Sequence, residues 1–307
     1  MKVDFDSSKI FFIGGAPRSG TTLMQRILTS HSLVFGGPEF DLIPSVMKLR
    51  NMFHASVDAG RISEFLDHDN VDEIFREFVI SAFKKSMQGK SKKKYFSEKT
   101  PFNTEVFVEI AETFPLAKLI LVVRDPRSIV SSMLEVGEKY KKEGHRGPKF
   151  TRDVRNAIYF INELWGVASK VIDKNNMYVV FYEDIVLNPN AVIYDITKKL
   201  GLVFEKSMVQ IEKQKTITAE FKGDELMWYS KEKLQSPIDK KSLEKWKSQL
   251  SAYELFVINK RLRQISGITD RYQLAQQSNL IFKVIDIVGN ALFDAKKSLT
   301  LKPRNYL

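Results

Sequence analysis

The sequence predicts an α/β protein in which a central parallel sheet is flanked by helices, with helical insertions and one further helix near the C-terminus. Three short apolar runs lie far apart in the chain, within residues 9–17, 118–123 and 176–185. Stretches with helical spacing of apolar residues lie between them. Buried strands that alternate with helices are typical of a parallel sheet covered on both faces.

The first unit covers residues 9–31. The run "KIFFIGGAP" (9–17) is apolar and ends in glycine and proline, which is typical of a buried strand that enters a turn. The next stretch, "TTLMQRILTSH" (21–31), has apolar residues at helical spacing, and Thr21 is available to cap its N-terminus. We expect strand, loop and helix in that order.

Later segments repeat this plan. "KLILVVRDPRSIVSSML" (118–134) predicts a strand from Leu119 to Val123, a polar turn and a helix from Pro126, and "NMYVVFYEDI" (176–185) supplies a third buried strand. The Gly-rich basic stretch 136–152 predicts a mobile surface loop. The remaining helical stretches are expected at 41–54, 71–88, 103–114, 153–173 and 190–201, whereas the polar stretch 212–245 gives no clear assignment.

Neither an internal repeat nor a long linker divides the chain, so we expect one domain over residues 1–275. Residues 276–307 form a second unit, an amphipathic helix at 278–299 followed by a basic tail. Three alternatives are open for this helix: docking on the body of the protein, contact in a homodimer, or binding to a membrane surface.

Composition limits the classes of function. The 307 residues include 48 Lys and Arg against 37 Asp and Glu, a formal net charge of +11, which favours an anionic partner such as nucleic acid, a membrane surface, a nucleotide or an acidic peptide. With no cysteine there is neither a disulfide framework nor a thiolate site, and four scattered histidines predict no metal site. The first ten residues resemble no signal peptide, so we expect a cytoplasmic protein of prokaryotic origin.

The loop after the first predicted strand has the glycine spacing of a nucleotide-binding phosphate loop. Gly15 and Gly20 are separated by four residues, but Thr21 stands where such loops carry lysine, followed by Thr22. That lysine reaches the β- and γ-phosphates of nucleotides. The backbone amides and the helix N-terminus can still bind an anion, and Arg18 adds a forked cation. A simple Gly/Pro turn with a capping threonine is the alternative.

The wording "PRSGTTLM" resembles the 5′-phosphosulfate loop of sulfotransferases that use 3′-phosphoadenosine 5′-phosphosulfate (PAPS), and is most similar to the tyrosylprotein sulfotransferases and their bacterial relatives. The resemblance covers residues 9–135 and, more loosely, 176–250. It implies a phosphate-loop-like fold, makes residues 1–275 a PAPS-binding domain, and implies that PAPS leaves as 3′,5′-adenosine bisphosphate (PAP). The loop residues implied to bind the donor are Arg18, Ser19, Gly20, Thr21 and Thr22.

The family's second motif places an arginine at a strand end and a serine eight residues later, both on the 3′-phosphate. Arg124 and Ser132 have this spacing. An arginine at the strand end and a serine two helical turns along can converge on one dianion. Tyr182, in "VVFYEDI", matches an aromatic position and is implied to lie near the adenine, unless it is a core tyrosine with a bonded hydroxyl.

Sulfuryl transfer needs a base for the acceptor proton and positive charge on the departing phosphate. By the resemblance, Glu39 in "FGGPEFDLIP" is the base, and Lys99 in "FSEKTPF" stabilises the developing charge together with Arg18. For Glu39 the alternative is a solvent-facing loop carboxylate, and for Lys99 one more lysine after a basic run. We expect Glu98 to be a surface or ion-pairing group.

Two departures from the family pattern affect the acceptor and the donor contacts. Asp41 stands where the tyrosyl enzymes carry an arginine that helps to hold the acceptor. Ser236 stands where they carry a lysine on the donor, with Ser230 and Lys231 as substitutes. The acceptor is therefore open: a tyrosyl peptide, a carbohydrate, a lipid head group or a small metabolite.

Two other classes of function compete with a sulfotransferase. A nucleotide kinase on the same fold should carry lysine at position 21 and need magnesium. A non-enzymatic anion- or nucleic-acid-binding protein should show steep salt dependence, but no basic strip interleaved with aromatic residues is visible, so we expect no nucleic-acid partner.

Overall fold

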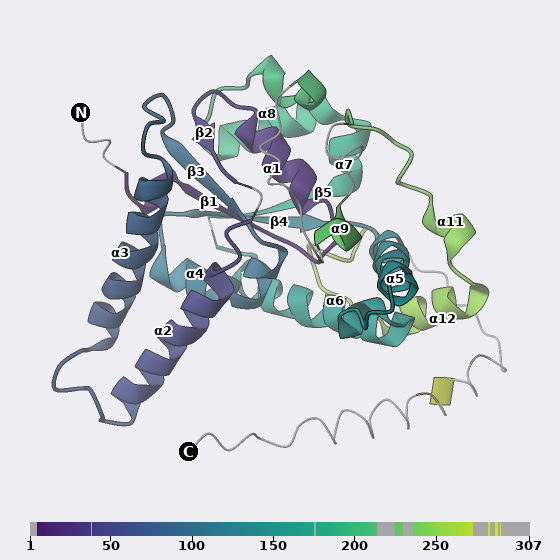
Figure 1. Cartoon of the computed structure of the whole chain (residues 1–307), viewed down its shortest axis with the longest axis horizontal. Coiled ribbons are helices and arrows are strands. Elements are labelled where there is room, and N and C mark those ends of the chain that lie inside the picture. Colours follow the sequence, from purple (N-terminus) through teal and green to yellow (C-terminus); the bar gives the residue numbers. More distant parts are fainter. Residues whose placement is uncertain are drawn as a thin grey trace.

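The sheet has five strands, all parallel, in the order β2-β3-β1-β4-β5. The strands are β1 (Ile10–Gly14), β2 (Val34–Phe35), β3 (Tyr95–Lys99), β4 (Lys118–Val123) and β5 (Met177–Phe181). The computed structural model describes residues 5–37, 39–174, 176–213, 225–229, 236–272, 282, 286–287 and 289. Helices lie on both sides of this sheet, which confirms the predicted fold class (Figure 1).

Alternate residues of the central strand face two separate apolar clusters. Phe11 and Ile13 pack with α1 (Thr21–Thr29) and α8 (Pro189–Lys199), whereas Phe12 packs with α6 (Val154–Ala168) and α12 (Ala252–Arg261) on the other face. Successive side chains of a strand point to opposite faces, so a strand covered on both sides must be apolar throughout. This is why β1 could be recognised as a continuous apolar run.

The order in which strands are added to the sheet changes direction at β1. From β1 the chain moves to β2 and β3 on one side, and then crosses to β4 and β5 on the other. In parallel α/β sheets, ligands bind beyond the carboxyl ends of the strands at such a switch point. The loop of residues 15–20 follows β1 and lies at this position.

The sequence predicted three strands and did not predict β2 and β3. β2 has only two residues, and β3 has the sequence "YFSEK", whose Ser97, Glu98 and Lys99 are all buried. Polar residues in a buried strand do not form an apolar run. The sequence of β3 therefore carries no strand pattern, although β3 lies next to the central strand.

The remaining helices are α2 (Ile43–Asp58), α3 (His68–Ser86), α4 (Phe107–Thr113), α5 (Pro126–Lys142), α7 (Tyr182–Leu187), α9 (Glu225–Trp228) and α11 (Trp246–Gln249). Five helices follow the predicted stretches closely, namely α2, α3, α4, α6 and α8, with α4 preceded by a 3₁₀ segment, Pro101–Val106, inside the stretch predicted as one helix. The stretch 176–185 was predicted as one strand, but its last four residues, from Tyr182, belong to helix α7, and α9 and α11 were not predicted. Long α2 and α3 pack against each other at one side of the molecule, away from α5 and α12 (Figure 1).

The prediction of a surface loop at 136–152 is wrong for its first part. Helix α5 continues to Lys142, and Val136 and Tyr140, one helical turn apart, are buried. Gly137, which suggested a loop, is a packing residue: a Cβ there would lie 2.0 Å from the carbonyl oxygen of Thr151. The glycine therefore allows a close approach between the helix and the following chain.

The predicted cap of α1 is also wrong. Thr21 is the first helical residue, and the N-cap is Gly20 with φ 107° and no side-chain cap hydrogen bond. The helix therefore starts directly on a glycine in the left-handed region, a conformation that L side chains rarely adopt.

Most of the predicted helix 278–299 lies outside the described residues. Phe282 packs against Tyr253 of α12 with ring centroids 5.8 Å apart. The carboxylate of Asp286 is fully buried and accepts hydrogen bonds from Arg155, Lys260 and Arg261 at 2.8–3.2 Å. Burial opposes the charge of Asp286, but the bonds from Lys260 and Arg261 outweigh it and lower its pKa. At Phe282 and Asp286 the chain contacts α6 and α12, as expected if this segment docks on the body of the protein.

Within the described ranges, no helix has the length and apolar character needed to cross a membrane.

Candidate active site

The candidate residues come from the carboxyl ends of all five strands. Arg18 follows β1, Glu39 follows β2 and Lys99 is the last residue of β3. Arg124 directly follows β4, and Tyr182 directly follows β5. Because the carboxyl ends of parallel strands share one edge of the sheet, five segments distant in sequence meet there.

The loop after β1 is tightly turned. Arg18 has φ 74° and Gly20 has φ 107°, both in the left-handed region that L side chains rarely adopt. At Gly20 a Cβ would lie 2.4 Å from the ring of Tyr182, so only glycine fits. The first turn of α1 follows at once, and the first N–H groups of a helix have no intrahelical partners and attract anions.

A cavity of ≈ 410 Å³ lies in front of this helix end. It is lined by Arg18, Gly20, Thr21 and Thr22 from the loop and α1, and by Arg124 from the end of β4. The opposite wall comes from α5, α7 and the chain around α9 and α11, with Ser128, Ser131, Ser132, Glu135, Tyr182, Trp228, Tyr229, Ser236, Ser242, Lys245 and Trp246.

Arg18 is held inside the cavity by two hydrogen bonds. Its Nε donates to Ser132 Oγ at 2.9 Å and its Nη1 donates to the carbonyl oxygen of Trp228 at 2.6 Å. Burial lowers the pKa of Arg18; nearby Tyr229 opposes this shift, and the positive charge of Arg124 adds to it. An arginine nevertheless stays charged in proteins, so two adjacent guanidinium groups create a strong positive potential here.

Arg124 is fixed at the far wall. Its guanidinium lies over the ring of Tyr182, 4.4 Å from the centroid, and donates from Nη1 to the carbonyl oxygen of Arg18 and from Nη2 to that of Ser242. Tyr182 Oη is hydrogen-bonded to Ser242 Oγ at 2.7 Å. Within the described residues Arg124 Nε is buried without a partner, so the guanidinium keeps a donor for an anionic ligand.

Ser132 and Ser19 differ from the sequence expectation in their details. Ser132 lines the same cavity as Arg124, but its hydroxyl accepts a hydrogen bond from Arg18. Ser19 is fully buried, does not line the cavity, and its backbone N–H donates to the carbonyl oxygen of Ala16. The structure thus brings Arg18, Arg124 and Ser132 together and leaves the side chain of Ser19 behind the loop.

Glu39 and Lys99 form a second cluster with a residue that the sequence reasoning missed, Tyr229. Lys99 Nζ and Tyr229 Oη both donate to Glu39 Oε1, and Lys99 Nζ lies 3.4 Å from Tyr229 Oη. The side chain of Lys99 is 2% exposed and that of Glu39 is 26% exposed. Burial and the negative charge of Glu39 raise the pKa of Tyr229, so its hydroxyl keeps its proton. Tyr229 was not predicted because its surrounding segment aligns only loosely with the family.

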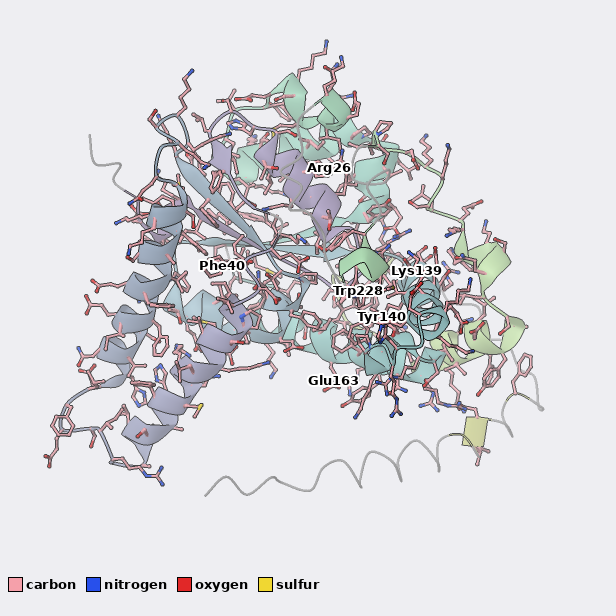
Figure 2. The ribbon with its side chains drawn as sticks, viewed as in Figure 1. Arg26, Phe40, Lys139, Tyr140, Glu163 and Trp228 are labelled. Atoms are coloured by element: carbon pink, nitrogen blue, oxygen red, sulfur yellow. The ribbon has the colours of Figure 1, made fainter. Side chains whose placement is uncertain are left out.

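The loop carrying Glu39 is anchored by its neighbours. Phe40 packs edge-on against Phe83 of α3, with ring centroids 5.3 Å apart, and lies between the sheet and the α2/α3 pair (Figure 2). Asp41 has φ 61°, and its N–H donates to Thr100 Oγ1 at 3.1 Å. Asp41 itself is exposed and does not line the cavity.

Glu98 is not a surface group, which corrects the sequence expectation. It is 1% exposed, and its carboxyl oxygens accept hydrogen bonds from Thr100 Oγ1 at 2.7 Å and from Asn103 Nδ2. Burial raises the pKa of Glu98 to about 7, against the opposing effects of these hydrogen bonds and of Lys99. Thr100 thus connects the buried carboxyl of Glu98 to the backbone of Asp41, two residues after Glu39.

The weakly aligned segment is only partly visible. Ser230 and Lys231 lie outside the described residues. Ser236 lines the cavity, and its carbonyl oxygen accepts a hydrogen bond from Arg26 Nη2 at 3.1 Å. In this contact Ser236 offers its backbone oxygen, whereas the family's lysine at this position would offer a positive charge.

The model of the sulfotransferase family matches residues 11–206, which include the carboxyl ends of all five strands described above. The chain belongs to the sulfotransferase family. It is 30% identical over 218 residues to protein-tyrosine sulfotransferase 2 of Gallus gallus, a match that covers 66% of this chain and 54% of that protein. The chain thus spans about half the length of this curated relative.

Two solved structures share the fold. The sulfotransferase domain from the curacin biosynthetic pathway has a TM-score of 0.56 and 20% identity, covering 87% of this chain and 98% of that one. The sulfotransferase domain from the Synechococcus PCC 7002 olefin synthase has a TM-score of 0.51 and 20% identity, covering 82% and 92%. At this identity they support the architecture alone.

Proposed function

We propose that this chain transfers the sulfuryl group of PAPS to an acceptor hydroxyl. The observation that carries the proposal is one cavity with two separate anion sites: the loop after β1, and Arg124, whose Nε has no partner among the residues that the structure describes. A donor with a 5′-phosphosulfate and a 3′-phosphate has its two anionic groups at separate positions.

The residues present fit this donor. The amides at the start of α1, with Thr21 and Thr22, would hold the 5′-phosphosulfate. Arg124 and Ser132 would hold the 3′-phosphate, and Tyr182, whose ring already packs on Arg124, would lie near the base. Thr21 in place of lysine suits a ligand without a γ-phosphate, which disfavours a nucleotide kinase.

The chemistry follows from the second cluster. When bound, the donor supplies a sulfuryl group attached to a phosphate leaving group. Glu39 takes the proton of the acceptor hydroxyl. Lys99 and Arg18 stabilise the negative charge that develops as the bond to the phosphate breaks, an effect that is strong for buried and pre-positioned cations.

The acceptor class stays open between a tyrosyl peptide, a carbohydrate, a lipid head group and a small metabolite. The name of the chicken relative supports a tyrosyl acceptor. The charge at Asp41 argues against an acidic peptide, because an exposed carboxylate beside Glu39 would repel it. A cytoplasmic location and a homodimer remain predictions.

The test uses labelled PAPS with a panel of these acceptors. Glu39→Gln removes the base while keeping the shape, and we expect turnover to fall by about 100-fold or more. Binding of PAP, which does not involve this proton, should stay near the wild-type value. Glu143→Gln, at an exposed position after α5, is the matched control and should behave as wild type. Unchanged turnover in Glu39→Gln would exclude Glu39 as the base, and magnesium-dependent phosphoryl transfer from ATP with no transfer from PAPS would favour the kinase.

A further inference from the structure

The hydroxyl of Tyr229 occupies the place where an acceptor hydroxyl must lie for the proposed reaction. It donates a hydrogen bond to Glu39, the proposed base, and lies 3.4 Å from Lys99 Nζ. A hydrogen bond also links it to Thr22 of the loop that would hold the phosphosulfate. The hydroxyl of Tyr229 is thus in contact with the proposed base, with the cation that would stabilise the leaving group, and with the loop that would hold the donor.

The segment that carries this tyrosine is fixed on both sides. Trp228 Nε1 donates a hydrogen bond to Tyr140 Oη at 3.1 Å, and Lys139 Nζ donates one to the carbonyl oxygen of Met227 at 3.4 Å. Figure 2 shows Trp228 beside Lys139 and Tyr140 of α5. On the other side the carbonyl oxygen of Trp228 accepts the bond from Arg18. These contacts place the phenol without any intermolecular encounter, which favours reaction at one fixed position.

We propose that Tyr229 is a sulfation site that the chain modifies in cis. The inference rests on the proposed function. Tyr229 Oη forms a bond to the sulfur of PAPS, and the bond between that sulfur and the bridging oxygen of the 5′-phosphate breaks. The phenolic proton passes to Glu39, and the electron pair of the broken bond leaves with PAP. The products are a tyrosine sulfate ester and PAP, with no oxidant or metal consumed.

The residues around Tyr229 decide whether it is modified in cis, by its own chain, or in trans, by a second molecule. Tyr229 is enclosed by Glu39, Lys99 and the first turn of α1, so the active centre of a second molecule cannot reach its hydroxyl while this segment is in place. The fraction of chain modified after a given time should therefore not depend on protein concentration. Modification in trans would instead accelerate with concentration.

The experiment incubates the full chain with PAPS and no external acceptor, followed by peptide mass spectrometry of its ten tyrosines. We expect the mass of one SO₃ group on Tyr229 alone. Tyr229→Phe removes the acceptor oxygen but keeps the ring, and should abolish the modification. Tyr194→Phe changes a tyrosine that is 60% exposed and serves as the matched control, with modification at the wild-type rate. Glu39→Gln should slow the modification by about 100-fold.

A parallel assay with 4-methylphenol as an external acceptor separates the two proposals. If the wild type sulfates 4-methylphenol while Tyr229 stays unmodified, the inference is overturned and the proposed function stands. If neither is sulfated although PAP binds, the inference is overturned, and the proposed function is overturned only if the whole acceptor panel also stays unmodified. Equal modification of wild type and Tyr229→Phe, or a rate proportional to protein concentration, also overturns modification of Tyr229 in cis.

Discussion

The buried carboxyl of Glu98 makes the stability of this protein dependent on pH in a direction that can be worked out. Its pKa is raised from 4.5 to about 7, first because burial removes the solvation of the charged form. The folded state therefore holds this proton more tightly than the unfolded state. By linkage, the contribution of Glu98 to stability is fully present below pH 4.5 and is lost as pH rises through about 7.

The magnitude follows from the shift. One pKa unit corresponds to about 1.4 kcal/mol, so the complete loss is about 3.5 kcal/mol, of which about 2.5 kcal/mol falls between pH 5 and pH 8. Glu98→Gln is neutral in both states and should lack this loss. Subtracting the variant from the wild type removes the titration of all other groups.

The assay is urea unfolding at pH 5 and pH 8, followed by the fluorescence of the three tryptophans. We expect the unfolding free energy of the wild type to fall by about 2.5 kcal/mol more than that of Glu98→Gln. Glu64→Gln, an exposed control, should follow the wild type. An equal fall in the wild type and Glu98→Gln would show that Glu98 does not titrate as its burial requires.

Three further changes give distinct outcomes. Lys99→Ala should lower turnover more than PAP affinity, as compared by steady-state kinetics and calorimetry, because its charge acts mainly on the developing phosphate; the reverse pattern would make it a binding residue. Gly20→Ala should weaken PAP binding, because its Cβ would lie 2.4 Å from the ring of Tyr182, whereas Gly60→Ala meets no atom within 4 Å and should leave PAP binding intact. Asp286→Asn should lower the unfolding free energy by about 3 kcal/mol without affecting PAP binding, since it removes a buried charge shared by three cations; unchanged urea unfolding would contradict this.

The sequence predicted the three strands that are continuous apolar runs and missed β2, which has only two residues, and β3, which is polar in part. β1, β4 and β5 were found because burial between two helix layers demands continuous apolar runs. β3 was missed because it carries Glu98 and Lys99 into the interior, where hydrogen bonds and an ion pair satisfy them. Such pairing depends on residues that are distant in sequence, so it cannot be predicted from the local sequence of a strand.

The same reasoning explains what was predictable in the site. Arg18 and Arg124 each follow an apolar strand, so the carboxyl edge of a parallel sheet brings them together. Tyr229 lies in a polar stretch with no recognisable period, and its position depends on anchoring by α5. The capping role of Thr21 was mispredicted because a left-handed glycine starts α1 instead.

The central claim is that one cavity binds the two phosphates of PAP at separate anion sites. Calorimetry of PAP against AMP, which lacks the 3′-phosphate, tests it most directly in the wild type and in Arg124→Ala. Charge-assisted hydrogen bonds contribute about 1.5–3 kcal/mol each, so the wild type should bind PAP about 10- to 100-fold more tightly than AMP. The neighbouring Arg127 is paired with Asp125 and does not line the cavity, so Arg127→Ala is the matched control. The account predicts that Arg124→Ala loses most of the preference and Arg127→Ala keeps it; equal binding of PAP and AMP to the wild type would contradict it.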